Sequence, residues 1–150
     1  MDKHAILEKF TFYQNALHPV QGRMAAVGQY ANFAAGTFLY HEGDKCDQFA
    51  LVGTGSIRVF KTTITGHEIT LYHVQDGQAC LVNMLSIFLQ RPAMATAVVE
   101  VPTESVIVPA ISFRNWVDSD DATRKFIFES MAVRLIDSVQ IGRASCRERV

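Results

Sequence analysis

Residues 51–77 read LVGTGSIRVFKTTITGHEITLYHVQDG, a series of short apolar runs separated by glycines. Glycines recur every 7 to 12 residues through the middle of the chain, at Gly36, Gly43, Gly55, Gly66 and Gly77. The runs between them are rich in β-branched and aromatic residues, which favour strands. This rhythm predicts a compact all-β barrel or sandwich with a turn at each glycine.

The clearest local signal within this stretch is a hairpin. Ile57 and Val59 lie on one face of a strand predicted over residues 56–63, and Thr65-Gly66 joins it to a second strand over residues 67–74. Other β-rich runs predict further strands over residues 37–40, 49–52, 96–101 and 105–108.

Helices are predicted at both ends of the chain. Residues 2–17 place Ile6, Phe10, Tyr13 and Leu17 on one apolar stripe. We predict shorter helices over residues 19–27, within 78–90 and over 110–117, and a long helix that Ser119-Asp120-Asp121 caps and that extends to about Gln140.

The composition is that of one globular domain. The chain has 150 residues, 49% of them apolar and 19% charged, and a net charge of −1. There is no basic signature of nucleic-acid binding, no apolar run long enough to span a bilayer and no apolar signal core at the N-terminus. We therefore expect a cytoplasmic protein with no membrane contact.

The last ten residues, 141–150, read IGRASCRERV and show no helical or strand periodicity. They resemble the conceptual translation of a DNA-sequencing adaptor, and the alternative is a natural basic tail. We predict a non-native tail, so that the helix over 119–140 is truncated. The expected organisation is a β roll with N-terminal helices over 1–118, a long helix over 119–140, and the tail over 141–150.

Five short motifs, in order along the chain, point to one family. Ala35-Gly36-Thr37 with His41-Glu42-Gly43-Asp44 resembles the opening of the Crp/Fnr family of bacterial transcription regulators, and residues 51–60 resemble its first hairpin. The remaining matches are Gly66-His67-Glu68-Ile69, the turn at Gly77, and Glu104 through Val108-Pro109 to Phe113. The resemblance implies a cyclic-nucleotide-binding-like jelly roll, a double-stranded β-helix, followed by a long helix that forms a homodimer.

The resemblance also locates the family's nucleotide cassette, in which a Gly-Glu pair binds the ribose and an Arg-Ser/Thr pair binds the phosphate. Counted from Gly77, the Gly-Glu positions hold Leu81 and Val82. Counted forward along the chain, the Arg-Ser/Thr positions hold Arg91 and Pro92. Counted back from Glu104, they hold Ala93 and Met94. Neither reading restores the carboxylate and the hydroxyl, so we expect no tight binding of cyclic nucleotides.

Other residues are candidates for sensing a small-molecule, gas or redox effector. Cys46 and Cys80 are candidate redox or ligand sites, and His73 is a candidate haem ligand, with ordinary packing as the alternative for each. Residues 1–45 contain no cysteine, which argues against an iron–sulfur cluster. Met84, Leu85, Phe88 and Leu89 are apolar and either line a pocket or fill the core. No cofactor is predicted.

The long helix carries the predicted dimer interface. Phe128, Met131, Leu135 and Val139 repeat at helical spacing and form a candidate seam with a second copy. The alternative is that this face packs only on its own β roll.

Two rival classes fit less well. A cupin-like metal enzyme needs a His-x-His pair, and the histidines at 4, 18, 41, 67 and 73 never form one. A stand-alone small-ligand-binding module of a channel or kinase keeps the phosphate cassette that this chain lacks. We predict no enzyme activity, no catalytic or metal-binding residue and no DNA-binding residue. The sequence is interpreted as the effector-sensing and dimerisation domain of a transcriptional regulator, which contacts DNA only through a domain missing from this chain.

Overall fold

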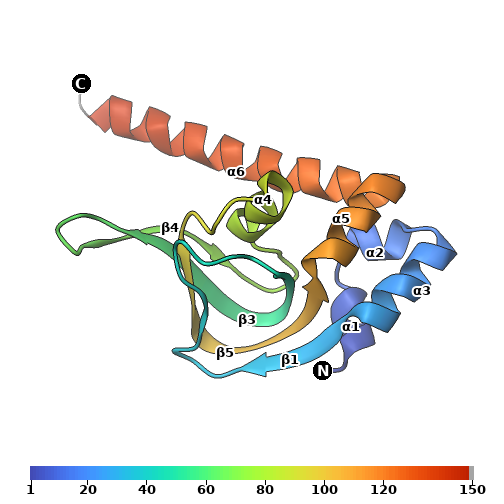
Figure 1. Cartoon of the computed structure of the whole chain (residues 1–150). Coiled ribbons are helices and arrows are strands. Elements are labelled where there is room, and N and C mark those ends of the chain that lie inside the picture. The colour runs from blue at the N-terminus through green and yellow to red at the C-terminus, as the bar shows by residue number, and fades with distance from the viewer. Residues whose placement is uncertain (149–150) are drawn as a thin grey trace.

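The computed structural model describes the backbone of residues 1–148 and the side chains of residues 1–137 and 139. Five antiparallel strands form one sheet in the order β1-β5-β3-β4, and β2 also pairs with β5. The sheet curls on itself as a roll, with helices grouped at one side and one long helix across it (Figure 1). The strands are β1 (Gln29–Phe33), β2 (Phe38–Tyr40), β3 (Gln48–Thr62), β4 (Glu68–Val74) and β5 (Thr96–Pro109).

The strands β3 and β5 are longer than the sequence indicates. Each was expected as two strands, but each continues through its bend with shifts of register between Val52 and Ile57. Gly55 makes the bend possible, because its φ is +123° and a Cβ there would lie 2.7 Å from the Cα of Thr103. The glycines interrupt the alternation of side chains without interrupting the pairing, so the prediction of separate strands was wrong.

The predicted hairpin is confirmed. Strand β3 pairs with β4 from Thr62–Glu68 to Ile57–Val74, around a turn in which Gly66 has a φ of +88°. Strand β1 was not predicted. Its five residues lack a strand-like apolar alternation, and its partner β5 lies far along the chain.

The N-terminal segment forms two short helices, α1 (Lys3–Leu7) and α2 (Thr11–Asn15), and not the single predicted helix. In the break between them, the Lys9 ammonium donates to the carbonyl oxygen of Gly53 in β3 at 2.6 Å. This contact and the close packing of Ile6 on Gly53 fix the segment to the sheet. A straight helix would give up this contact. The helix α3 (His18–Val27) follows, near the predicted bounds.

Three further helices follow in the second half: α4 (Leu81–Leu89), α5 (Ala110–Ser119) and α6 (Asp121–Glu148). Asp120 caps α6 as predicted, because its carboxylate accepts from the Thr123 amide at 3.0 Å and from the Thr123 hydroxyl at 2.7 Å. The helix was expected to end near Gln140, but its backbone continues to Glu148, through a segment that contains no proline. Residues 149 and 150 of the predicted tail lie outside the described residues. Within residues 1–148, no helix has the length and apolar character to cross a membrane.

The apolar interior is divided into two clusters. The larger lies where the helices meet the sheet, and there Phe49 of β3 stacks on Phe113 of α5 with ring centres 4.0 Å apart. The smaller lies inside the roll and includes Val52, Ile57, Val82 and Ala97. Most of the helices thus attach to the sheet through the first cluster, while the second fills the inside of the roll.

Candidate functional site

The interior of the roll contains a small cavity of about 160 Å³, which we call the roll cavity. Its walls come from β1, β2, β3, β5 and the start of α4. They carry apolar side chains and a few uncharged polar groups, and no described residue with a formal charge lines it. The lining residues are Phe33, Phe38, Leu39, Tyr40, Gln48, Phe49, Ala50, Val52, Ile57, Cys80, Asn83, Ala97 and Ile107.

A thiol and two phenols meet beside this cavity. The Cys80 sulfur lies 2.8 Å from the Tyr40 hydroxyl oxygen and 3.5 Å from that of Tyr72. The Tyr72 oxygen in turn accepts a hydrogen bond from the Val82 amide at 2.8 Å. Burial raises the pKa of both tyrosines well above its ordinary value. Both phenols are therefore neutral at physiological pH, and the group offers hydrogen bonds without charge.

The predicted cassette positions do not converge on one ligand. Gly77 forms a turn with φ +73°, and its amide donates to the Val52 carbonyl. Val82 is 8% exposed in the apolar cluster of the roll, whereas Leu81 packs against the larger core. Ala93 is buried and Met94 half-buried. Arg91 is exposed and lines a different cavity, not the roll cavity.

The candidate sensor residues separate in the same way. Cys80 belongs to the roll interior, while Cys46 is half-buried outside it, where burial raises the pKa of its thiol. His73 does not line the roll cavity, and its imidazole lies 3.3 Å from the Glu100 carboxylate. Among the described residues, no three His, Cys, Asp or Glu side chains gather as a metal site would require.

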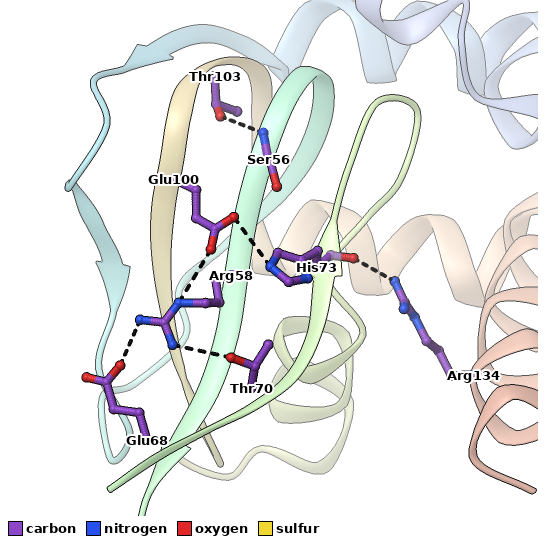
Figure 2. Close-up of polar contacts among 8 residues, drawn as sticks. All are labelled: Ser56, Arg58, Glu68, Thr70, His73, Glu100, Thr103 and Arg134. Atoms are coloured by element: carbon purple, nitrogen blue, oxygen red, sulfur yellow. Dashed lines mark hydrogen bonds and ion pairs between the residues drawn. The ribbon is translucent and has the colours of Figure 1, made fainter. Parts of the chain in front are cut away.

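A polar network on strands β3, β4 and β5 was not predicted from the sequence (Figure 2). The Arg58 guanidinium lies 2.8 Å from the Glu68 carboxylate and 3.5 Å from that of Glu100. Glu100 also contacts His73, so the network joins all three strands. Each partner alone looks like an ordinary surface residue, and only the strand register brings them together.

The same network is connected to α6 by Arg134. Its guanidinium donates to the His73 carbonyl oxygen at 3.1 Å (Figure 2). It also stacks over the Tyr72 ring, with 4.2 Å between the guanidinium carbon and the ring centre. Because the Tyr72 hydroxyl contacts Cys80, one side chain links the wall of the roll interior to the long helix. No local pattern predicts this link, because Tyr72 and Arg134 are distant in the chain.

The predicted dimer seam lies partly in solvent. Phe128 is 71% exposed and Leu135 is 66% exposed, and Val139 is also exposed. Met131 is half-buried and packs against the larger core. Phe128 and Met131 border an apolar groove of about 280 Å³ between α4 and α6, to which Met84, Leu85, Phe88 and Leu89 also contribute.

Comparison with known proteins agrees with this geometry. The model of the cyclic nucleotide-binding domain family matches residues 30–120. No curated protein matches the chain in sequence.

Solved structures share the fold at low sequence identity. One is a protein from Eubacterium rectale assigned to the Crp/Fnr family of transcriptional regulators (22% identity, TM-score 0.79), which covers 91% of this chain with 63% of its own. Another is the sensor domain of the transcriptional regulator DNR from Pseudomonas aeruginosa, with 15% identity and a TM-score of 0.72. The match covers 90% of this chain and 89% of that structure. A third is the N-terminal domain of a transcriptional regulator from Streptomyces coelicolor, with 20% identity and a TM-score of 0.64. The match covers 89% of this chain and 94% of that structure.

These neighbours are regulatory proteins, and they share with this chain the roll, its flanking helices and the C-terminal helix. With the family match over more than half of its length, the chain belongs to the cyclic nucleotide-binding domain family.

Proposed function

We propose that this chain is the effector-sensing and dimerisation domain of a Crp/Fnr-type transcriptional regulator whose effector is not a cyclic nucleotide. The observation that carries the proposal is a family fold whose cassette positions hold Leu81 and Val82 beside an uncharged cavity. The chain spans 63% of the E. rectale protein. In this proposal the intact regulator contacts DNA through a domain outside the sequence described.

The absence of charge in the roll cavity argues against a phosphate-bearing ligand. A buried phosphate requires cations or several convergent N–H groups, since an uncompensated charge in an apolar site is strongly unfavourable. The walls offer instead the neutral groups of Tyr40 and Cys80, with the Tyr72 hydroxyl 3.5 Å behind the Cys80 sulfur, and these suit a small uncharged effector.

Isothermal calorimetry with cAMP and with cGMP tests this exclusion. We expect no binding heat at micromolar concentrations of either nucleotide. Micromolar affinity for one of them would overturn the proposal. The variant L81G/V82E restores the family's Gly-Glu pair and tests the cassette positions. We expect this variant to remain without affinity for cyclic nucleotides, because the phosphate-binding arginine is still absent.

Tyr72 and Arg134 provide a route from the effector to the dimer helix. An effector that enters beside Cys80 displaces the Tyr72 hydroxyl. The Tyr72 ring then moves relative to the Arg134 guanidinium, which stacks on it. The position of α6 against the roll changes as a result. In an intact regulator, such a shift resets the paired recognition helices of a helix-turn-helix dimer.

The exposed apolar side chains of α6 fit a second copy of this chain. Sedimentation velocity over a range of protein concentrations measures the association. We expect L135E to weaken the dimer by at least about tenfold, since it places a charge at an apolar contact. The matched control is I64E, at the fully exposed tip of the β3–β4 hairpin, which should leave association unchanged. A wild-type protein that stays monomeric at high concentration would overturn this part of the proposal.

A further inference from the structure

A second, larger cavity of about 710 Å³ lies outside the roll, and we call it the α4–α5 cavity. The end of α4, the loop that follows it, the start of α5 and residues 45–47 form its walls. It shares no lining residue with the roll cavity. Its volume is within the range of about 300–1,000 Å³ that is common for small-molecule sites.

The charge in this cavity is positive. Lys45 and Asp47 pair with each other at 3.7 Å and offset one another. Arg91 and Arg114 also line it, and no ion pair joins either of them to a carboxylate within the part of the chain that the structure describes. Two guanidinium groups thus contribute uncompensated charge to one concave site.

The local backbone holds both arginines in place. With its amide oriented to satisfy both polar atoms, Gln90 accepts from the Arg114 guanidinium at 2.8 and 3.1 Å through a neutral oxygen. Gln90 ends α4 in the left-handed region, with φ +52°, and is the only non-glycine residue with positive φ among those described. This turn directs the chain so that Arg91 follows at the cavity.

Two further features supply donors to the same space. Helix α5 begins at Ala110 without a side-chain cap, and the Ala110 amide donates to the Asp47 carbonyl at 2.8 Å. The positive end of the helix and the start of its next turn, at Ile111, lie at the cavity wall. Ser86 lines the cavity and is 2% exposed, and its hydroxyl lies beside the Cys46 thiol, a weak acceptor, without a partner in full hydrogen-bond geometry. A buried hydroxyl without a partner is unfavourable in a native protein unless a ligand or water completes it.

We propose that the α4–α5 cavity binds a small organic anion. Arg91, Arg114 and the start of α5 face its negative group, and the Ser86 hydroxyl donates to it. The apolar side chains of Ile87, Pro92 and Ile111 line the cavity beside these groups and contact the body of the ligand. This site is separate from the roll interior and from the effector proposed for it.

Benzoate is a suitable probe, because benzamide has the same shape without the charge. Titration of isotope-labelled protein followed by amide NMR should show saturable shifts with benzoate at residues 86–91 and 110–114. The shifts should weaken as salt rises, and benzamide should bind at least about tenfold less tightly. Equal affinity for both probes, or shifts confined to residues of the roll cavity, would overturn the proposal.

Variants separate binding from stability. Arg91 and Arg114 are exposed, so R91Q and R114Q should fold, and each should weaken benzoate binding about tenfold. The matched control R23Q removes an exposed arginine of α3 and should have no effect. S86A should weaken benzoate binding several-fold, whereas S105A, at the other buried hydroxyl without a partner, should not. If R23Q lowers affinity as much as R91Q, the effect is general electrostatics and the site is refuted.

Discussion

The roll cavity and the α4–α5 cavity both border α4, the first at Cys80 and Asn83 near its start, the second at Ser86, Ile87 and Gln90 near its end. The first is small and uncharged, and the second is larger and lined by two unpaired guanidinium groups. The cavity inside the roll and the cavity with groups suited to an anion are therefore two different regions of this chain. In a domain of this fold, the cavity inside the roll and a cavity with positive charge can therefore be separate.

The largest expected effect comes from placing a charge inside the roll. V82E puts a carboxylate in the apolar cluster and should lower the free energy of unfolding by about 3 kcal/mol at pH 7. Burial raises the pKa of such a group above its unfolded value of about 4.3, so the loss is full above the raised pKa and diminishes as pH falls toward 4.3. Urea denaturation at several pH values measures it.

V82Q is the control for this variant, since it is polar without a titratable group. Its stability difference from wild type should not follow that pH dependence. A V82E protein as stable as wild type at pH 7 would show that the roll interior tolerates charge, and the contrast between the two cavities would fail.

The second effect is a difference between the two thiols. In a C146S background, Cys46 should react with a disulfide reagent at least about a hundredfold faster than Cys80, because modification of the buried Cys80 requires local opening. Since burial raises the pKa of Cys46, its rate should continue to rise with pH above about 8.5, the usual thiol pKa. Single variants C46S and C80S assign the two rates, and both thiols should react alike in urea. Equal rates in the folded protein would contradict the burial of Cys80 in the roll interior.

A smaller effect is expected from Y72F. The variant leaves the Val82 amide without its acceptor and should lower the free energy of unfolding by about 1–2 kcal/mol. Y30F removes an exposed phenol that donates to Glu104 and is the matched control, with a smaller loss. Chemical denaturation of both variants checks the order, and the reverse order would weaken the role of Tyr72 between the roll and α6.

The smallest effect concerns the two buried hydroxyls without partners. S86A and S105A should each raise the free energy of unfolding by up to about 1 kcal/mol, since each removes a buried polar atom without a partner. Added benzoate should reduce the advantage of S86A alone, because only that variant loses a ligand contact. Thermal melts with and without benzoate measure this, and a uniform response would remove the functional distinction between the two serines.

The parts of the fold that depend on neighbours in sequence were predictable. The hairpin at Thr65-Gly66 and the cap at Asp120 are encoded within a few residues. Strand β1 was missed because its stability comes from pairing with β5, as in Tyr30 with Val106, and not from its own pattern.

The same distinction applies to the site. The sequence alone shows that Leu81 and Val82 stand where the family has its Gly-Glu pair, because this depends only on which residues occupy the motif positions. The contact of Cys80 with Tyr40 and the link of Arg134 to Tyr72 depend on distant segments meeting in the fold. Three separate segments of the chain form the α4–α5 cavity, so no local pattern indicates it.

The pairing of β3 with β5 also has a consequence during synthesis. Gln48 pairs with Pro109 and Phe60 with Thr96, so one side of β3 is completed only when residues made much later leave the ribosome. The β3–β4 hairpin can form early, but residues 49–52 remain an apolar strand edge without a pairing partner until β5 has been synthesised. We expect folding to be limited by the arrival of β5, and the nascent chain to be most prone to aggregation just before that point.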